Sequence, residues 1–231
     1  MKRMLTAVAT AGLLTGCLGA TDLSPGFTIP YDFNVLKDGW TAFAVDYPEA
    51  QTAAVGFAGD VRSLPAPLST TSVGLYLSGN NVSGDLFMYQ IRYVTGFAAN
   101  HTYTATIQVE YATNIHDGCT TGPGPETFIK AGVTATPPVI TTDGQGVRRL
   151  NYDKGVGTSA GVFTQLGDIR SGLVGCPTPG TYSAWGTPIR TQQLPLVTDV
   201  SGGFFIFIGT QSSFVGFHEI FFTRMNLTLE D

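Results

Sequence analysis

Charged residues are scarce in this chain. Lysine and arginine together number 12 and aspartate and glutamate 17, so charged residues make up 13% of the 231 positions, roughly half of the about 25% in an ordinary soluble domain. The formal net charge is −5. Because binding to a nucleic-acid backbone requires a basic face, this shortage of positive charge excludes nucleic acid as a partner.

Long apolar runs are also lacking. Beyond the first seventeen residues, no stretch approaches the roughly 18 apolar residues of a membrane-spanning helix. Glycine (29) and proline (13) are abundant but show no Gly-X-Y period and no single block. This distribution excludes a collagen-like chain and a coiled coil, and it indicates many short elements separated by turns. The length is enough to bury a core in one domain, or at most two.

The N-terminal segment has the pattern of an export signal. Met1-Lys2-Arg3 supplies a positive start, and residues 4–14 form an apolar or small-residue stretch that is too short to span a bilayer. The segment ends in Leu14-Thr15-Gly16-Cys17, which resembles the lipobox of bacterial lipoproteins.

The resemblance implies a signal peptide at 1–16, a lipidated Cys17 and a tether at 17–26. It implies a protein of the bacterial cell envelope, anchored to the membrane through its lipid and facing the periplasm or the exterior. The alternative is an ordinary signal peptide cut after Ala20.

Two cysteines remain once Cys17 is assigned to the lipid. Cys119 and Cys176 both lie in glycine- and proline-rich sequence. In an exported protein such a pair favours a disulfide between two loops over a metal or catalytic site. Two free thiols are the alternative. No Cys/His spacing favours zinc.

Hydrophobic alternation with period two continues through most of the chain. Between His101 and Tyr111 every second residue is apolar and the residues between are threonine, glutamine or glutamate, which predicts a strand with one buried and one wet face. Residues 87–93 and 221–229 alternate in the same way. Residues 204–208 are apolar at every position, as expected of a strand that is covered on both sides.

These patterns predict an all-β protein, a single antiparallel β-sandwich of jelly-roll type over residues 27–231. No window indicates a helix, and turn signals separate about ten to twelve strands. The further predicted strands are 27–33, 40–47, 53–57, 72–78, 127–134, 147–152, 161–166 and 190–199.

Several segments resemble a family of secreted all-β bacterial proteins with no established activity. They are Asp38-Gly39-Trp40 with Asp46-Tyr47-Pro48, residues 77–89, residues 103–114, residues 128–132, residues 151–155, and residues 206–210 with 213–216. The resemblance covers most of the mature chain. It implies one exported all-β domain and adds nothing about chemistry.

Residues 157–161 match the G-x-S-x-G motif of α/β-hydrolases. Ser159, then Asp168 or Asp199, then His218 also follow the chain order of such a triad. The motif requires a strand before the serine and a helix after it, however, and neither pattern is present. The sequence therefore favours a glycine-rich turn at this position.

His218-Glu219 does not continue into a zinc motif, because Phe222 stands where the second histidine of H-E-x-x-H is required. Glu219 shares parity with Phe221 and Met225, which predicts that it lies on the apolar side of the last strand. As a catalytic acid it would need a second carboxylic group nearby, and the sequence identifies none. A strand-end glutamate that reaches water or pairs with an arginine is the simpler interpretation.

The turn before residue 86 offers oxygen ligands for a hard cation. Asn80, Asn81 and Asp85 could bind Ca²⁺, although the loop carries one carboxylate and an asparagine-rich turn explains the same residues. No other cofactor is expected.

Three aromatic residues stand in or near predicted loops: Trp40, Tyr182 and Trp185. With Glu219, they are the candidate ligand-binding residues. Together with the fold class, they favour a non-catalytic binding module for glycan or another extracellular polymer. Two alternatives remain open. One is a structural or assembly component that contacts other envelope proteins, and the other is a hydrolase.

The lipobox gives a direct prediction. Replacing Cys17 by serine removes the acceptor of the lipid, so we expect Cys17→Ser to leave the precursor uncleaved at this site and released from membranes. Membrane fractionation with N-terminal peptide mapping measures both effects. Processing after Ala20 that is unaffected by the substitution would contradict the lipoprotein assignment.

Overall fold

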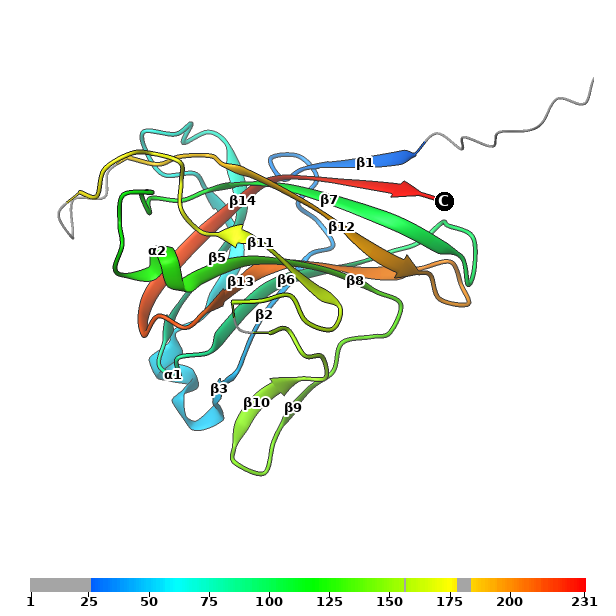
Figure 1. Ribbon diagram of the computed structural model, residues 1–231, viewed down its shortest axis with the longest axis horizontal. Coiled ribbons are helices and arrows are strands. Elements are labelled where there is room, and N and C mark those ends of the chain that lie inside the picture. Colours follow the sequence, from blue (N-terminus) through cyan, green and yellow to red (C-terminus); the bar gives the residue numbers. More distant parts are fainter. Residues whose placement is uncertain (1–25, 156, 178–183) are drawn as a thin grey trace, which may run out of the picture.

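The period-two segments form antiparallel strands that pack into a jelly-roll sandwich (Figure 1). The computed structural model describes residues 26–155, 157–177 and 184–231. The predicted signal peptide, Cys17 and Tyr182 lie outside the described residues.

One layer of the sandwich, sheet A, has the strand order β12-β7-β14-β5-β4, and β1 pairs with β14. Its strands are β1 (Phe27–Asp32), β4 (Ala58–Ser63), β5 (Val73–Asn81), β7 (Thr102–Ala112), β12 (Ile189–Val197) and β14 (Gly216–Glu230).

The other layer, sheet B, has the order β11-β8-β13-β6-β2. Its strands are β2 (Thr41–Val45), β6 (Leu86–Val94), β8 (Thr127–Thr134), β11 (Phe163–Asp168) and β13 (Phe204–Ser212). A third, small sheet joins β3 (Tyr47–Pro48), β10 (Val147–Leu150) and β9 (Ile140–Thr142).

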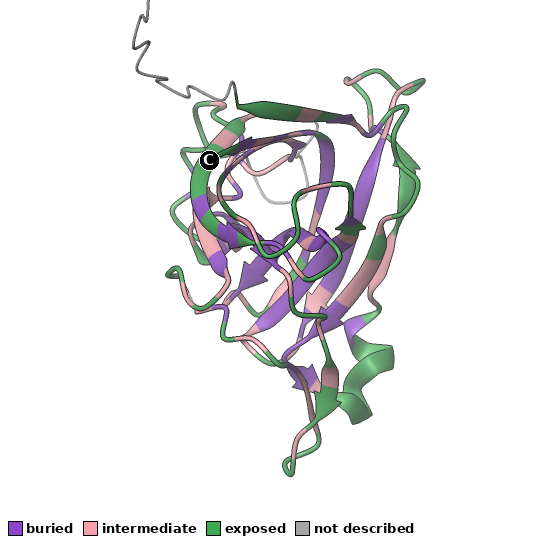
Figure 2. Cartoon of the chain, turned by 90° about the vertical axis from the view of Figure 1, so that its right-hand side faces the viewer, coloured by how far each residue is buried: buried purple, intermediate pink, exposed green. Residues whose placement is uncertain are grey.

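The main core lies between sheets A and B. Met88 and Ile208 from sheet B meet Tyr111 and Leu227 from sheet A, and all four side chains are fully buried. Burying side chains of this size stabilises a fold by about 1.5–3 kcal/mol each. Figure 2 shows the buried strand segments at the centre of the sandwich.

A second core covers the outer face of sheet B. Phe87, Tyr89 and Phe207 point away from sheet A and pack against Leu150 and Phe163. We call the segment that supplies this packing the cover: strands β9 and β10 and the described residues from 151 to 163. The β9–β10 hairpin projects below the sandwich in Figure 1.

The predicted strand at 53–57 is wrong. Residues 49–55 form a short 3₁₀ helix (Glu49–Gln51) followed by α1 (Thr52–Val55), and Gly56 ends α1 with a left-handed φ of 54°. The apolar run indicates burial, but in a helical turn only Val55 points inward. Strand β4 begins just after it. The second α-helix is α2 (Pro123–Glu126), and no described helix is long and apolar enough to cross a membrane.

A β-bulge at Thr223 reverses the predicted orientation of Glu219. The register of β14 against β7 shifts between Phe222 and Arg224. The side chains before the bulge therefore alternate with opposite parity from those after it. Phe222 and Met225 both point into the main core, whereas Phe221 and Glu219 lie on the outer face of sheet A.

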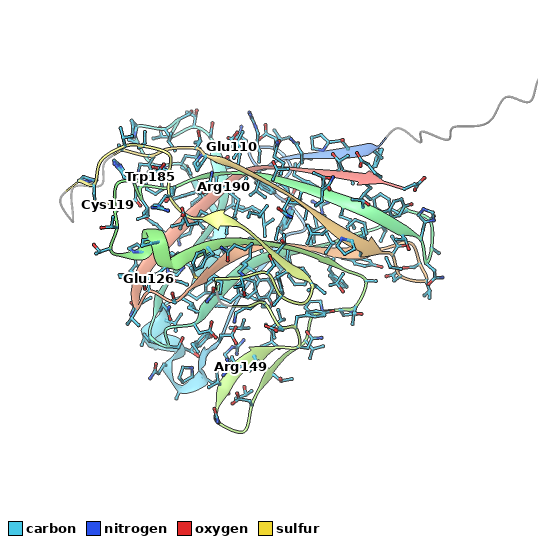
Figure 3. All side chains as sticks on the ribbon, in the orientation of Figure 1. Glu110, Cys119, Glu126, Arg149, Trp185 and Arg190 are labelled. Atoms are coloured by element: carbon cyan, nitrogen blue, oxygen red, sulfur yellow. A yellow bond between two sulfur atoms is a disulfide. The ribbon has the colours of Figure 1, made fainter. Side chains whose placement is uncertain are left out.

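The disulfide between Cys119 and Cys176 is confirmed, with Cα atoms 4.7 Å apart. Cys119 is labelled in Figure 3. The two loops approach so closely that a Cβ on Gly118 would lie 2.6 Å from the carbonyl carbon of Gly175. Glycine is therefore required where the loops cross.

Removing this disulfide should destabilise the protein. The two cysteines are 57 positions apart in the sequence. The chain-entropy model predicts that closing a loop of this length stabilises the folded protein by roughly 4 kcal/mol. We expect Cys119→Ala with Cys176→Ala to lower the free energy of unfolding by about 2–4 kcal/mol in urea denaturation. An unchanged denaturation midpoint would contradict this role.

Candidate functional site

The two described tryptophans of the predicted site serve as packing residues. Trp40 lies edge-on to Tyr31 and Phe33, at ring distances of 5.8 and 5.4 Å, and packs against the main core. Trp185 lies edge-on to Phe221 at 5.6 Å on the outer face of sheet A. Neither ring is presented as a free flat platform.

Glu219 is held by a tyrosine. Tyr76 donates its hydroxyl to Glu219 Oε2 at 2.7 Å, and burial, together with this hydrogen bond, raises the pKa of Tyr76 to about 12. The Arg62 guanidinium lies 4.0 Å from the centre of the Tyr76 ring. Glu219 also lines an apolar hollow of about 280 Å³ that is bordered by Phe214 and Phe217.

The residues proposed for Ca²⁺ have partners within the chain. The side-chain oxygen of fully buried Asn81 accepts hydrogen bonds from the backbone amides of Ser83, Gly84 and Leu86, so it organises the turn. Asp85 accepts hydrogen bonds from other side chains, and the Asn80 amide donates to the carbonyl of Ala54. In the described residues, no three His, Cys, Asp or Glu side chains form a group suited to a metal ion.

Ser159 lies in the loop directly before a turn at residues 161–162. Its hydroxyl is 3.1 Å from that of Thr164, and it accepts the backbone amide of Gln165 at 3.0 Å. These two hydrogen bonds connect the end of the cover to β11.

The candidate binding site lies elsewhere, on the part of sheet B that the cover leaves open. Register pairs bring the side chains together: Tyr93 of β6 stands opposite Phe205 of β13, and Ile91 of β6 stands opposite Thr41 of β2. Residues directly opposite each other point to the same face of a sheet. With Phe43 these side chains form the floor of one groove.

We call this surface the aromatic groove: Gly39, Thr41, Phe43, Ile91, Arg92, Tyr93, Pro137, Pro138 and Phe205, enclosing about 390 Å³. The Tyr93 and Phe205 rings lie 4.7 Å apart at 43°. Tyr93 is 41% exposed, and Phe43 and Phe205 are half-buried. Pro137 and Pro138, just before β9, complete the groove on the side of the cover.

Hydrogen bonds fix the polar end of the groove. The Tyr93 hydroxyl donates to Asp199 Oδ2 at 2.6 Å, and Ser201 donates its hydroxyl to Asp199 Oδ1 at 2.7 Å. These bonds, and that from the backbone amide of Gly203, hold the pKa of Asp199 well below its usual range. The carboxylate therefore stays ionised and keeps the Tyr93 ring in position.

Arg92 fixes the part of the groove around Gly39. Its guanidinium donates to the carbonyl of the preceding residue, Asp38, at 2.7 Å. Gly39 has a φ of 80° and would bring a Cβ to 3.5 Å from the Arg92 guanidinium carbon. The groove thus has an apolar floor, fixed aromatic rings and a few polar groups at its rim, which suits a ligand with flat apolar faces and hydroxyl edges.

Sequence reasoning missed Tyr93 and Phe205 as site residues. Both are predicted strand positions, and aromatic residues at strand positions are core residues in most sandwiches. The available signal is that Tyr93 closes an alternating run just before a glycine turn, where a strand reaches the end of its sheet. The pairing with Phe205 depends on a contact between strands more than one hundred residues apart.

Comparisons with known proteins give likenesses of shape. No family model and no curated protein matches the chain. The xylan-binding domain CBM22-1 of Paenibacillus barcinonensis Xyn10C is 11% identical with a TM-score of 0.38, over 89% of this chain and 97% of that one. The K1 cleaved adhesin domain of Lys-gingipain from Porphyromonas gingivalis W83 is 11% identical with a TM-score of 0.40, over 87% and 98%.

The enzymatically active domain of tailspike protein 4 from bacteriophage CBA120 is 11% identical with a TM-score of 0.35. The alignment covers 86% of this chain and 19% of the tailspike. At these identities and TM-scores, no ligand or activity of this chain follows from the likenesses.

His218 is a buried titratable group between the sheets. It is 2% exposed, and its Nε2 lies 3.4 Å from the Thr210 hydroxyl. Burial lowers the pKa of His218 to about 4 from an ordinary 6.5, because the imidazolium loses hydration there. The side chain is therefore neutral in the folded protein at neutral pH.

This shift predicts acid sensitivity. Between about pH 6.5 and pH 4 the unfolded chain binds more protons than the folded one, so the stability that is complete above pH 6.5 falls as the pH drops. At about 1.4 kcal/mol per pKa unit, the loss reaches at most about 3.5 kcal/mol. We expect His218→Gln to flatten this part of the pH profile of urea unfolding.

The matched control is His101→Gln. The His101 side chain is exposed and paired with Asp231. The substitution His101→Gln should therefore leave most of the pH dependence of the unfolding free energy in place. If His218→Gln does not change the pH dependence of stability seen in the wild-type protein, the acid sensitivity is not due to His218.

Proposed function

We propose that this protein is a non-catalytic glycan-binding module, held at the bacterial cell envelope by a lipid on Cys17. The observation that carries the proposal is the aromatic groove, in which Tyr93, Phe205 and Phe43 line one open face of sheet B. The N-terminal sequence supports the anchor.

The chemistry of a sugar ring fits this groove. A pyranose presents a flat face of C–H bonds and an edge of hydroxyl groups. Aromatic rings such as Tyr93 and Phe205 bind such faces by burying apolar area. The Thr41 hydroxyl and the Asp199 carboxylate stand at the borders of the same surface and can bind the hydroxyl groups.

The charge balance favours a neutral glycan. Cleavage before Cys17 removes Lys2 and Arg3 and leaves an excess of acidic residues larger than the −5 of the whole chain. An anionic polymer would be repelled by this field. Near the groove, the guanidinium of Arg92 already donates to the Asp38 carbonyl, and Asp199 adds a negative charge.

Binding is rigid on the protein side. The Tyr93 ring is fixed by Asp199, the Phe205 ring by its contact with Tyr93, and the wall by two prolines. A surface that is ordered before binding loses little side-chain entropy when the ligand arrives. The groove can therefore bind a sugar chain through few contacts.

The test is binding of soluble neutral polysaccharides, such as xylan and mannan, measured by affinity electrophoresis and calorimetry, with polygalacturonate as the anionic comparator. We expect Tyr93→Ala or Phe205→Ala to weaken binding about tenfold each, because a stacked aromatic contact contributes up to about 1.5 kcal/mol. Tyr93→Phe should weaken binding less, because this substitution keeps the aromatic ring and removes only the hydrogen bond to Asp199.

Phe217→Ala is the matched control. Phe217 is a 56% exposed phenylalanine on β14, in the hollow beside Glu219 and outside the aromatic groove. Its removal should leave affinity unchanged. Loss of binding in Phe217→Ala with none in Tyr93→Ala would move the site to the other hollow, and no binding to any neutral glycan would reject the function.

A further inference from the structure

The cover is attached to sheet B by a cluster of three charged side chains, two of which are buried. Lys154 of the cover reaches Asp46, which follows β2, and Asp85, which precedes β6. We call these three residues the lysine–aspartate cluster. Arg149, labelled on β10 in Figure 3, binds Asp46 from a second direction.

The distance between Lys154 and Asp46 is short and the pair is nearly dry. Lys154 Nζ lies 2.6 Å from Asp46 Oδ2, and the two side chains are 8% and 7% exposed. The ring of fully buried Phe87 is centred 5.9 Å from the same Nζ. An amine and a carboxyl group are thus held in contact beside an aromatic wall, away from bulk water.

Asp46 is fixed in an unusual conformation. Its φ is +66°, a region that residues other than glycine seldom adopt and that persists only where surrounding contacts enforce it. Its amide donates to the Arg148 carbonyl at 2.7 Å, and its carbonyl accepts the Ser83 hydroxyl at 2.7 Å. Arg149 donates to Asp46 Oδ1 at 3.0 Å. The free carboxyl oxygen, Oδ2, is left pointing at Lys154.

Asp85 completes the cluster as a group that can carry a proton. Its Oδ1 lies 3.3 Å from Lys154 Nζ and accepts the Gln211 amide at 3.0 Å. Burial raises the pKa of Asp85 above its ordinary value, against the lowering effect of Lys154. Burial therefore favours the protonated form of the carboxyl group that lies beside the amine.

We propose that Lys154 and Asp46 condense into an isopeptide bond between Lys154 Nζ and Asp46 Cγ, with Asp85 as the proton carrier. The cluster is then a self-modification site that covalently joins the cover to the end of β2. The proposal stands independently of the glycan-binding function.

The reaction needs no other reactant. The Lys154 ammonium gives one proton to Asp85, and the freed amine attacks Asp46 Cγ. Arg149 stabilises the negative charge that develops on Oδ1. Asp85 returns its proton to Oδ2, a second proton from the nitrogen follows, the Cγ–Oδ2 bond breaks, and Oδ2 leaves as water. One ammonium and one carboxylate become one amide and one water molecule.

Position and dryness favour the condensation. Two groups fixed in contact react as if at very high concentration, because the entropy of bringing them together is already lost on folding. Exclusion of water removes the nucleophile that would reverse the step. Lys130 is the internal comparison. It is fully buried, but its ammonium donates to the carbonyl oxygens of Lys154 and Thr158, which cannot condense with an amine.

The experiment is peptide mass spectrometry of the full-length protein after tryptic digestion. Trypsin cuts after lysine and arginine, so an isopeptide at Lys154 leaves residues 38–62 joined to residues 150–170, lighter than their sum by one water molecule, with no cut after Lys154. We expect this linked species to predominate. Free 38–62 together with cleavage after Lys154 in the wild-type protein would overturn the proposal.

Variants separate the bond from an ordinary ion pair. Lys154→Arg should yield only free 38–62. Asp46→Asn should still link, because the amide loses ammonia where the acid loses water, to give the same product. Asp85→Asn should reduce the linked fraction at least tenfold.

Lys37→Arg is the control, because Lys37 is exposed on a loop and arginine preserves the tryptic site; the linked species should persist. A linked species that survives Lys154→Arg, or that forms equally in Asp85→Asn, would reject the mechanism.

Discussion

Sheet B is apolar on both faces, and the rest of the structure follows from that. Its inner face packs on sheet A, while its outer face carries Phe87, Tyr89 and Phe207. An outer face of this size left in water would expose a patch that soluble proteins rarely tolerate. The cover buries most of it, and the aromatic groove is the part that the cover does not reach.

A cover made mostly of loop needs attachment, because loops supply few apolar contacts of their own. Leu150 and Phe163 provide the hydrophobic part, and the lysine–aspartate cluster provides the polar part. Charges are rare in this chain, yet Lys154, Asp46 and Arg149 are concentrated here. A buried ion pair adds little net stability over apolar packing, so its position at the attachment point indicates a role in fixing geometry or in chemistry.

The sandwich was predictable because alternation is a local property. Residues 204–208, apolar throughout, were expected to be covered on both sides, and in β13 Ile206 and Phe207 belong to the two separate cores. The predictions that failed concern features that depend on tertiary structure. The bulge at Thr223 has no signature in β14, and it placed Glu219 on the opposite face from the one its parity predicts. Tyr93 and Phe205 form a site only through the register of distant strands.

The attachment of the cover and the shape of the groove are mechanically related. Pro137 and Pro138 form one wall of the groove and lead directly into β9, which pairs with β10. Strand β10 in turn pairs with β3, next to Asp46, and Arg149 of β10 binds that carboxylate. Whatever holds Asp46 to the cover therefore also limits how far the proline wall can move from Tyr93. A groove that binds through few contacts requires such a fixed wall, because a mobile wall would lose conformational entropy when a ligand is bound, and that loss would weaken binding.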